Sequence, residues 1–229
     1  MARGLTRTRS ALTVARPCGF RTGFLVPSGS SERTTRGSRM TTRVELICHA
    51  ATAATRHTAF PGDEPLPVTG TAGPLPRVHI ALSGPELRCR QTAAMLGLEP
   101  EIDERLRECD YGSWRGRTLA ELTDAEPDAV QAWLTDPAAA LHGGESIVDL
   151  ITRVGAWLGE LPDTRQRIAA VTHPSVIRAV LVHVLRAVPE SFWRIDIAPL
   201  SRTSLVAGRG GWTLTGLGKL EDRPHLPNV

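Results

Sequence analysis

The sequence predicts an α/β fold: a three-layer, doubly wound, mostly parallel sheet with helices on both faces. Short apolar runs that resemble buried strands, at 44–48, 77–84 and 167–173, alternate with amphipathic stretches that resemble helices. After Met40 there is no internal repeat and no interdomain linker, so we expect one domain over residues 40–229. In such sheets, ligands bind beyond the carboxyl ends of the strands.

The first strong helix signal follows the second strand. The pattern Ser83-x-x-Glu86, with Pro85 near the first helical position, predicts a capping box and a helix that runs to about residue 96. A second pattern of this kind begins at Thr118 and predicts another helix, which the region of Pro127 interrupts or restarts.

Two longer helices and three closing strands complete the chain. Apolar residues recur at spacings of three and four from Ile147 to Leu161, after the sequence "HGGES", and again from Ile177 to Leu185, after Pro174. The predicted closing strands are 194–198, 202–208 and 211–216, the last two joined by a Gly-rich turn.

The net charge of +3 conceals two unlike parts. The first 39 residues hold eight of the 27 basic residues and one of the 24 acidic residues, which leaves 19 and 23, a net charge of −4, from Met40 onward. We therefore expect no nucleic-acid binding. Residues 1–39 are rich in Arg and Ser, and we expect a disordered extension. They fit a targeting peptide or a start codon assigned too early, and we favour the second because a strand begins just after Met40.

The cysteines and the apolar runs bear on location. The four cysteines show no C-x-x-C spacing, and no secretory signal precedes them, so we expect free thiols in the cytoplasm. The apolar runs of residues 1–39 are too short to span a bilayer, and we expect no membrane partner.

Reactive side chains stand at the ends of three predicted strands. His49 and His173 each end a strand, and Arg88 lies just beyond the strand that ends at Ser83. A helix start and an arginine suit a phosphate, because unpaired N–H groups and a planar guanidinium both bind anions. A neutral imidazole can attack phosphorus, and a nearby carboxylic acid can protonate the departing alkoxide.

Five short motifs occur in order: "CHA" at 48–50, "SGPELRCRQTA" at 83–93, "ECDYGSWRG" at 108–116, "GGES" at 143–146 and "THPSVIR" at 172–178. In this order the chain resembles the histidine phosphatase (phosphoglycerate mutase-like) superfamily, from about residue 43 to 216. The resemblance implies that His49 is the nucleophile, that Arg88 and His173 bind the phosphoryl group, and that Glu108 is the proton donor.

The first motif departs from the family's Arg-His-Gly. Cys48 stands at the phosphate-binding position where the resemblance implies an arginine. Loss of one charged hydrogen-bond partner costs about 1.5–3 kcal/mol, which corresponds to roughly 10- to 100-fold in binding or rate. Ala50 and Pro174 replace the glycines that follow the two histidines. Arg56 is a candidate to substitute at the phosphate.

Each of these residues also has a structural interpretation. His49 and His173 could be strand-end or helix-capping histidines, and Arg88 could be a surface arginine paired with Glu86 or Asp110. We expect no metal and no cofactor, because adjacent strand residues point to opposite faces and no zinc-ligand spacing occurs. A cysteine-phosphatase loop needs Cys-x5-Arg, and seven residues separate Cys48 from Arg56.

The sequence therefore predicts a metal-independent phosphomonoesterase that acts on a small phosphorylated metabolite through phosphorylated His49. The resemblance also permits a narrower activity on α-ribazole phosphate. The alternative, motivated by Cys48, Ala50 and Pro174, is a degenerate member that binds a phosphorylated ligand or a protein partner without turnover. A homodimer is left open.

Overall fold

The computed structural model describes residues 41–67, 75, 77–162 and 165–220. The described residues belong to one compact unit, Arg39–Val229; residues 1–39, predicted to be a disordered extension, lie outside them. Six strands form a single sheet in the order β3-β2-β4-β1-β5-β6. Their bounds are Arg43–Cys48 (β1), Ile80–Ser83 (β2), Glu101–Ile102 (β3), Arg167–Thr172 (β4), Ser201–Gly208 (β5) and Gly211–Lys219 (β6).

The sheet is mixed. The pairings β1–β4, β4–β2 and β2–β3 are parallel, whereas β5 pairs antiparallel with both β1 and β6. The register places Cys48 opposite Thr172 and Ser83 opposite Val171. The carboxyl ends of β1, β4 and β2 therefore meet at one edge of the sheet, as predicted.

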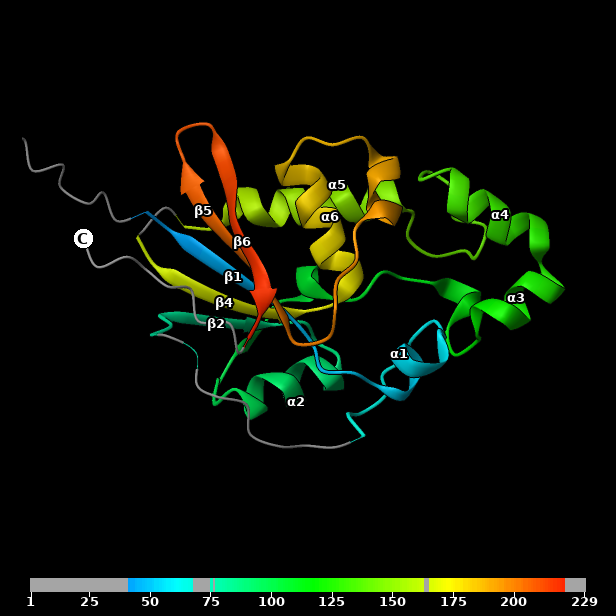
Figure 1. Cartoon of the computed structure of the whole chain (residues 1–229), viewed down its shortest axis with the longest axis horizontal. Helices are drawn as coiled ribbons and strands as arrows, with labels where there is room; N and C mark the ends of the chain where they lie inside the picture. Colours follow the sequence, from blue (N-terminus) through cyan, green and yellow to red (C-terminus); the bar gives the residue numbers. More distant parts are fainter. Residues whose placement is uncertain (1–40, 68–74, 76, 163–164, 221–229) are drawn as a thin grey trace, which may run out of the picture. The chain divides into compact units, whose positions relative to one another are not determined.

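Helices cover both faces of the sheet, which confirms the predicted fold class (Figure 1). Helix α2 (Leu87–Met95) lies on one face, and α5 (Ile147–Glu160) and α6 (Pro174–Val184) lie on the other. Neighbouring strand residues serve the two faces in turn: Leu46 and Ala170 pack in the cluster of α5 and α6, whereas Ile47 and Val171 pack in that of α2. Within the described residues, no helix is both long and apolar enough to cross a lipid bilayer.

Short helices fill the chain between the main layers. They are α1 (Ala53–His57), α3 (Leu119–Ala125), α4 (Pro127–Thr135) and the 3₁₀ turns η1 (Glu104–Leu106), η2 (Gly112–Trp114) and η3 (Pro189–Arg194). The predicted capping box at Thr118 is present, and the predicted interruption occurs at Glu126, which ends α3 and precedes α4. Phe60 packs against Tyr111, Trp114 and Trp133, with ring centroids 4.8–5.4 Å apart, and so joins the α1 segment to this layer.

Two predictions of local structure are wrong. Ser83 does not cap α2, because its hydroxyl donates to the Gly84 carbonyl, and Glu86, the residue before the helix, turns its carboxylate toward other partners. Residues 194–198 form no strand: Arg194 is the last residue of η3, and 195–198 follow it as irregular chain. Ile197 is buried in the core cluster, so the apolar alternation there reflects packing and not strand pairing.

Candidate active site

The site lies at the sheet edge where three parallel strands end. His49 directly follows β1, His173 directly follows β4, and Arg88 occupies the first turn of α2, just after β2. The backbone N–H of His49 donates to the Thr172 carbonyl (2.9 Å), which extends the β1–β4 ladder by one residue. The histidine rings are 5.2 Å apart between centroids, at an angle of 65°. The topology thus brings the predicted histidines and arginine together.

The hydrogen bonds of His49 determine its tautomer. Its Nδ1 lies 2.7 Å from the Ala50 carbonyl oxygen, which can only accept, so Nδ1 carries the proton. Its Nε2 is the acceptor for the Nε–H of Arg88 at 3.3 Å. Burial, together with the charge of His173, lowers the pKa of His49 to about 4. His49 is therefore neutral near pH 7 and presents an Nε2 lone pair, as a nucleophile requires.

Arg88 is fully buried and connects the reactive groups. In addition to His49 it contacts the Gly62 carbonyl (NH1, 2.5 Å) and the Glu108 carboxylate (NH2, 3.3 Å). Glu64 adds an ion pair at 3.8 Å. A buried guanidinium with carboxylate partners is held in one orientation, and its N–H groups face the histidines.

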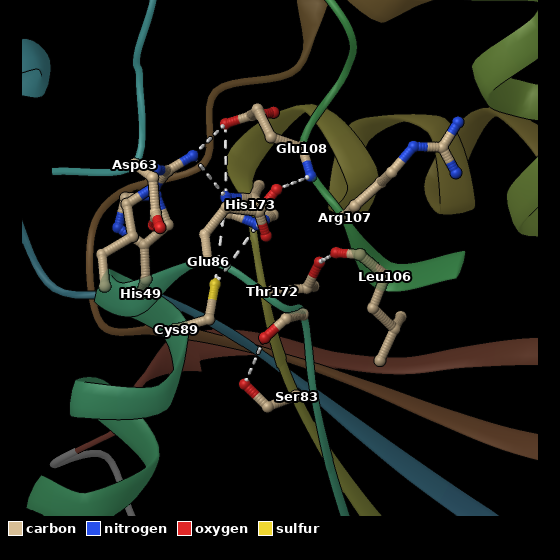
Figure 2. A network of polar contacts seen from close by, with 12 residues as sticks. His49, Asp63, Ser83, Glu86, Cys89, Leu106, Arg107, Glu108, Thr172 and His173 are labelled. Atoms are coloured by element: carbon tan, nitrogen blue, oxygen red, sulfur yellow. Dashed lines mark hydrogen bonds and ion pairs between the residues drawn. The ribbon is translucent and has the colours of Figure 1, made fainter. Parts of the chain in front are cut away.

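His173 lies between two carboxylates, as Figure 2 shows. Its Nε2 is 2.8 Å from Glu86 Oε2, and its Nδ1 is 3.3 Å from Glu108 Oε2. The Cys89 sulfur is 3.3 Å from Nε2. Burial alone would lower the pKa of His173, but Cys89 and Glu108 raise it well above its ordinary value. The two carboxylates therefore favour the protonated ring, and Arg88 NH2 also lies 3.2 Å from Nδ1.

Glu108 is ionised in this arrangement. Its Oε1 accepts from the Ser175 hydroxyl and from the Cys109 N–H (3.0 Å), and its Oε2 faces Arg88 and His173. Burial would raise the pKa of this carboxyl, but His173 and then Arg88 hold it well below its ordinary range. The predicted proton donor is thus in place, although it holds no proton to donate before a ligand enters.

The two remaining predicted residues lie apart from this network. Cys48 is fully buried in the core cluster on the α6 side of the sheet, and burial raises the pKa of its thiol. A neutral thiol carries none of the charge that an arginine would bring. Arg56 is exposed on α1, and its side chain makes no hydrogen bond or ion pair with the described residues.

The sequence did not predict Glu86 as a site residue. Its Oε1 accepts from the backbone N–H of Glu108 at 2.9 Å while its Oε2 holds His173. A Cβ at Gly84 would lie 2.8 Å from the Leu106 carbonyl and 3.1 Å from His173 Nε2. Glycine at this position therefore lets the turn before Glu86 approach His173 closely. The only sequence feature that pointed to Glu86 was its position two residues before Arg88. The Ser-x-x-Glu spacing favoured a capping box for this residue instead.

Two groups of described side chains could supply metal ligands: His49, Glu108 and His173, and Glu86, Cys89 and His173. His173 is common to both, and its nitrogens already donate to carboxylates. A metal ion would have to displace those protons and to bind within reach of the Arg88 cation, since metal ligands must be deprotonated. The arrangement favours an anion over a metal ion.

A small cavity opens onto the site. Its volume is about 70 Å³, and it is lined by Pro61, Gly62, Asp63, Glu86, Arg88, Glu108, Cys109 and Arg115. A larger cavity, about 410 Å³, lies beside β3 and the end of α5. His49 and His173 line neither of these two cavities, but the smaller one is lined by Arg88, which contacts His49, and by Glu108, which contacts His173.

Residues 45–219 match a model of one protein family, the histidine phosphatase superfamily (branch 1). The chain belongs to this superfamily. The match extends from β1 to β6 and so includes every strand of the sheet.

Individual members of the superfamily are similar to this chain over different lengths. Glucosyl-3-phosphoglycerate phosphatase of Mycobacterium tuberculosis is 34% identical over 122 residues, 46% of this chain and 53% of that protein. Phosphoserine phosphatase 1 of Hydrogenobacter thermophilus is 28% identical over 110 residues, 47% of this chain and 52% of that protein. The chain thus spans about half the length of each of these two relatives.

Solved structures of this superfamily share the fold. The mycobacterial glucosyl-3-phosphoglycerate phosphatase in complex with VO3 gives a TM-score of 0.64 at 24% identity, covering 77% of this chain and 98% of that one. The α-ribazole phosphatase of Shigella flexneri gives 0.67 at 21% identity, covering 77% and 96%. At these identities the likeness establishes the three-dimensional frame.

Proposed function

We propose that the protein is a cytoplasmic, metal-independent phosphomonoesterase that acts on a small phosphorylated metabolite through phosphohistidine at His49. The observation that carries the proposal is the state of His49: Nδ1–H is held by Ala50, and the Nε2 lone pair faces Arg88 and the ring of His173. Phosphatase names among its relatives support the same reaction class.

In the first step, His49 Nε2 attacks phosphorus while the bond from phosphorus to the ester oxygen breaks. Arg88 and His173 donate to the non-bridging oxygens, where charge gathers in the transition state. To do so they turn from Glu108 Oε2, which they contact at 3.3 Å before the ligand enters.

The same movement prepares Glu108 as an acid. Before ligand entry, His173 and Arg88 hold its pKa low against the effect of burial. A phosphoryl group takes over both contacts and brings negative charge, so the pKa rises and the carboxylate takes up a proton. Glu108 then gives this proton to the leaving alkoxide, and in the second step it accepts one from the water that attacks phosphohistidine.

A non-catalytic role is the second candidate. Cys48 offers a buried neutral thiol where an arginine is implied, and the carboxylates of Glu86 and Glu108 offset the cations of Arg88 and His173. A site with so little net positive charge would bind phosphate weakly. It could still hold a phosphorylated ligand or partner without turnover.

The experiment compares the wild type, His49→Ala and Cys48→Arg. Phosphate release from a panel of phosphomonoesters, including phosphoserine, 3-phosphoglycerate derivatives and α-ribazole phosphate, is measured with EDTA present. We expect His49→Ala to lower the rate by about 10³-fold or more. Rapid quenching with radiolabelled substrate should trap an acid-labile phosphoenzyme in the wild type only.

Cys48→Arg tests how far the missing arginine limits the site. We expect this variant to bind inorganic phosphate with a dissociation constant roughly 10- to 100-fold lower. Its melting curve checks that it folds. A silent wild type with an active Cys48→Arg would support the non-catalytic role. Turnover that survives His49→Ala would overturn the phosphohistidine route.

A further inference from the structure

The cavity at the site contains two cationic side chains in different states. Arg88 has no exposed surface, and its guanidinium is engaged by His49, Gly62 and Glu108. Arg115 lines the same cavity, and its side chain is 58% exposed. One arginine therefore serves the reaction centre, and the other stands at the rim.

Arg115 keeps most of its donors available. Its NH2 group donates to Asp110 Oδ1 at 3.0 Å, and no other hydrogen bond or ion pair of its guanidinium involves the described residues. Asp110 is 44% exposed and also accepts from the Gly112 N–H at 2.9 Å. An exposed pair of this kind contributes little net free energy, so a ligand can share or displace it.

The other charged groups of the cavity are acidic. Glu86 and Glu108 are paired with the buried cations, and Asp63 accepts from the Leu87 N–H at 2.6 Å. A second anionic group on a ligand would be repelled by these carboxylates. Among the residues that line the cavity, Arg115 is the cation with free donors that could offset this repulsion.

The cavity brings the two arginines to one ligand site. It is small, about 70 Å³, and both Arg88 and Arg115 line it. A ligand whose phosphoryl group lies against the buried Arg88 therefore extends toward the solvent side of the cavity, where the exposed Arg115 lies. A carboxylate close to the phosphoester would meet Arg115 there.

We propose that Arg115 determines specificity by binding a carboxylate on the leaving group, so that the preferred substrates are short phosphorylated carboxylic acids. The inference rests on the proposed phosphomonoesterase. The role of Arg115 concerns the charge of the ligand and is separate from the chemistry at His49.

The test compares two ligands that differ by one carboxylate, phosphoserine and phosphoethanolamine. Their dissociation constants are measured calorimetrically in full-length His49→Ala, with and without Arg115→Gln. We expect Arg115→Gln to raise the dissociation constant of phosphoserine about tenfold and to change that of phosphoethanolamine by less than twofold. Arg115→Lys should restore part of the loss. Arg90→Gln, which removes an exposed arginine that does not line the cavity, should change neither ligand.

The proposal is overturned if Arg115→Gln weakens both ligands equally, because Arg115 would then bind the phosphate itself. It is also overturned if phosphoserine binds no more tightly than phosphoethanolamine in the parent. Turnover with His49 intact reports separately on the proposed function: a carboxylate-dependent affinity without hydrolysis would leave Arg115 in this role on a binding protein.

Discussion

At the scale of single residues, Glu86 is the clearest addition to the predicted site. It joins His173 to the backbone of Glu108 with contacts of 2.8 and 2.9 Å, so one carboxylate positions both the proposed phosphate-binding histidine and the proposed acid. The hydrogen bond and charge of His173 lower the pKa of Glu86 although burial opposes this. The coupling is mutual, so Glu86 favours the protonated form of His173.

Glu86→Gln should therefore move the pH profile as well as the rate. Without this carboxylate the pKa of His173 falls, and the alkaline limb of kcat/KM should shift to lower pH. We expect kcat/KM at neutral pH to fall by about tenfold. Glu99→Gln, at an exposed site, is the control for loss of one negative charge. A lower rate with an unmoved alkaline limb would assign Glu86 a merely structural role.

The sequence could predict four of the reactive groups because they stand in motifs at strand ends. His49, Arg88, Glu108 and His173 do converge. Glu86 could not be predicted, because its function depends on the turn at Gly84 that brings β2 beneath His173. Nor could pattern alone give the charge of Glu108, which depends on which cations face it.

At the scale of elements, α5 fixes the segment that carries Glu108. Arg153 on α5 binds the Glu145 carboxylate through two contacts of 2.7 Å and donates to the carbonyls of Arg105 (2.6 Å) and Arg107 (3.1 Å). The Arg153 and Glu145 side chains are 11% and 9% exposed. The pair therefore joins α5 to η1 and to the chain that follows it, with little access for solvent.

Breaking this pair should cost far more than breaking a surface pair of the same segment. We expect Glu145→Ala to lower the free energy of unfolding by about 3–5 kcal/mol, because it leaves the Arg153 cation buried without its partner. Glu160→Ala removes the exposed partner of Arg105 and should cost less than about 1 kcal/mol. Urea denaturation of both variants checks the difference, and equal losses would contradict the assignment.

Element prediction succeeded where a pattern and its packing agree. The periodic apolar stripe after Ser146 forms α5, and the residues after Pro174 form α6. It failed at 194–198, where β5 already occupies the free edge of β1 and the apolar side chains pack without pairing. Short apolar alternation cannot separate these outcomes, because both bury every second side chain.

At the scale of the whole molecule, the site sets how stability depends on pH. The ordinary pKa of histidine is 6.5, and that of folded His49 is about 4. Between these values the unfolded chain binds a proton that the folded chain excludes, so stability falls as pH falls. The raised pKa of His173 acts oppositely: its stabilising contribution is fully present below pH 6.5 and is lost as pH rises from 6.5 through the raised folded value. The lowered pKa of Glu108 contributes stability that is lost only as pH falls below about 4.5.

His49 should therefore dominate the site's contribution between pH 6.5 and 4.5. We expect it to lower the free energy of unfolding by about 2 kcal/mol across this window, measured by urea denaturation at a series of pH values. His49→Gln should flatten the slope. A residual slope should remain, because burial also lowers the pKa of His142. An unchanged slope in His49→Gln would mean that folding does not lower the pKa of His49, and the ring would then be protonated, and unable to attack phosphorus, below about pH 6.5.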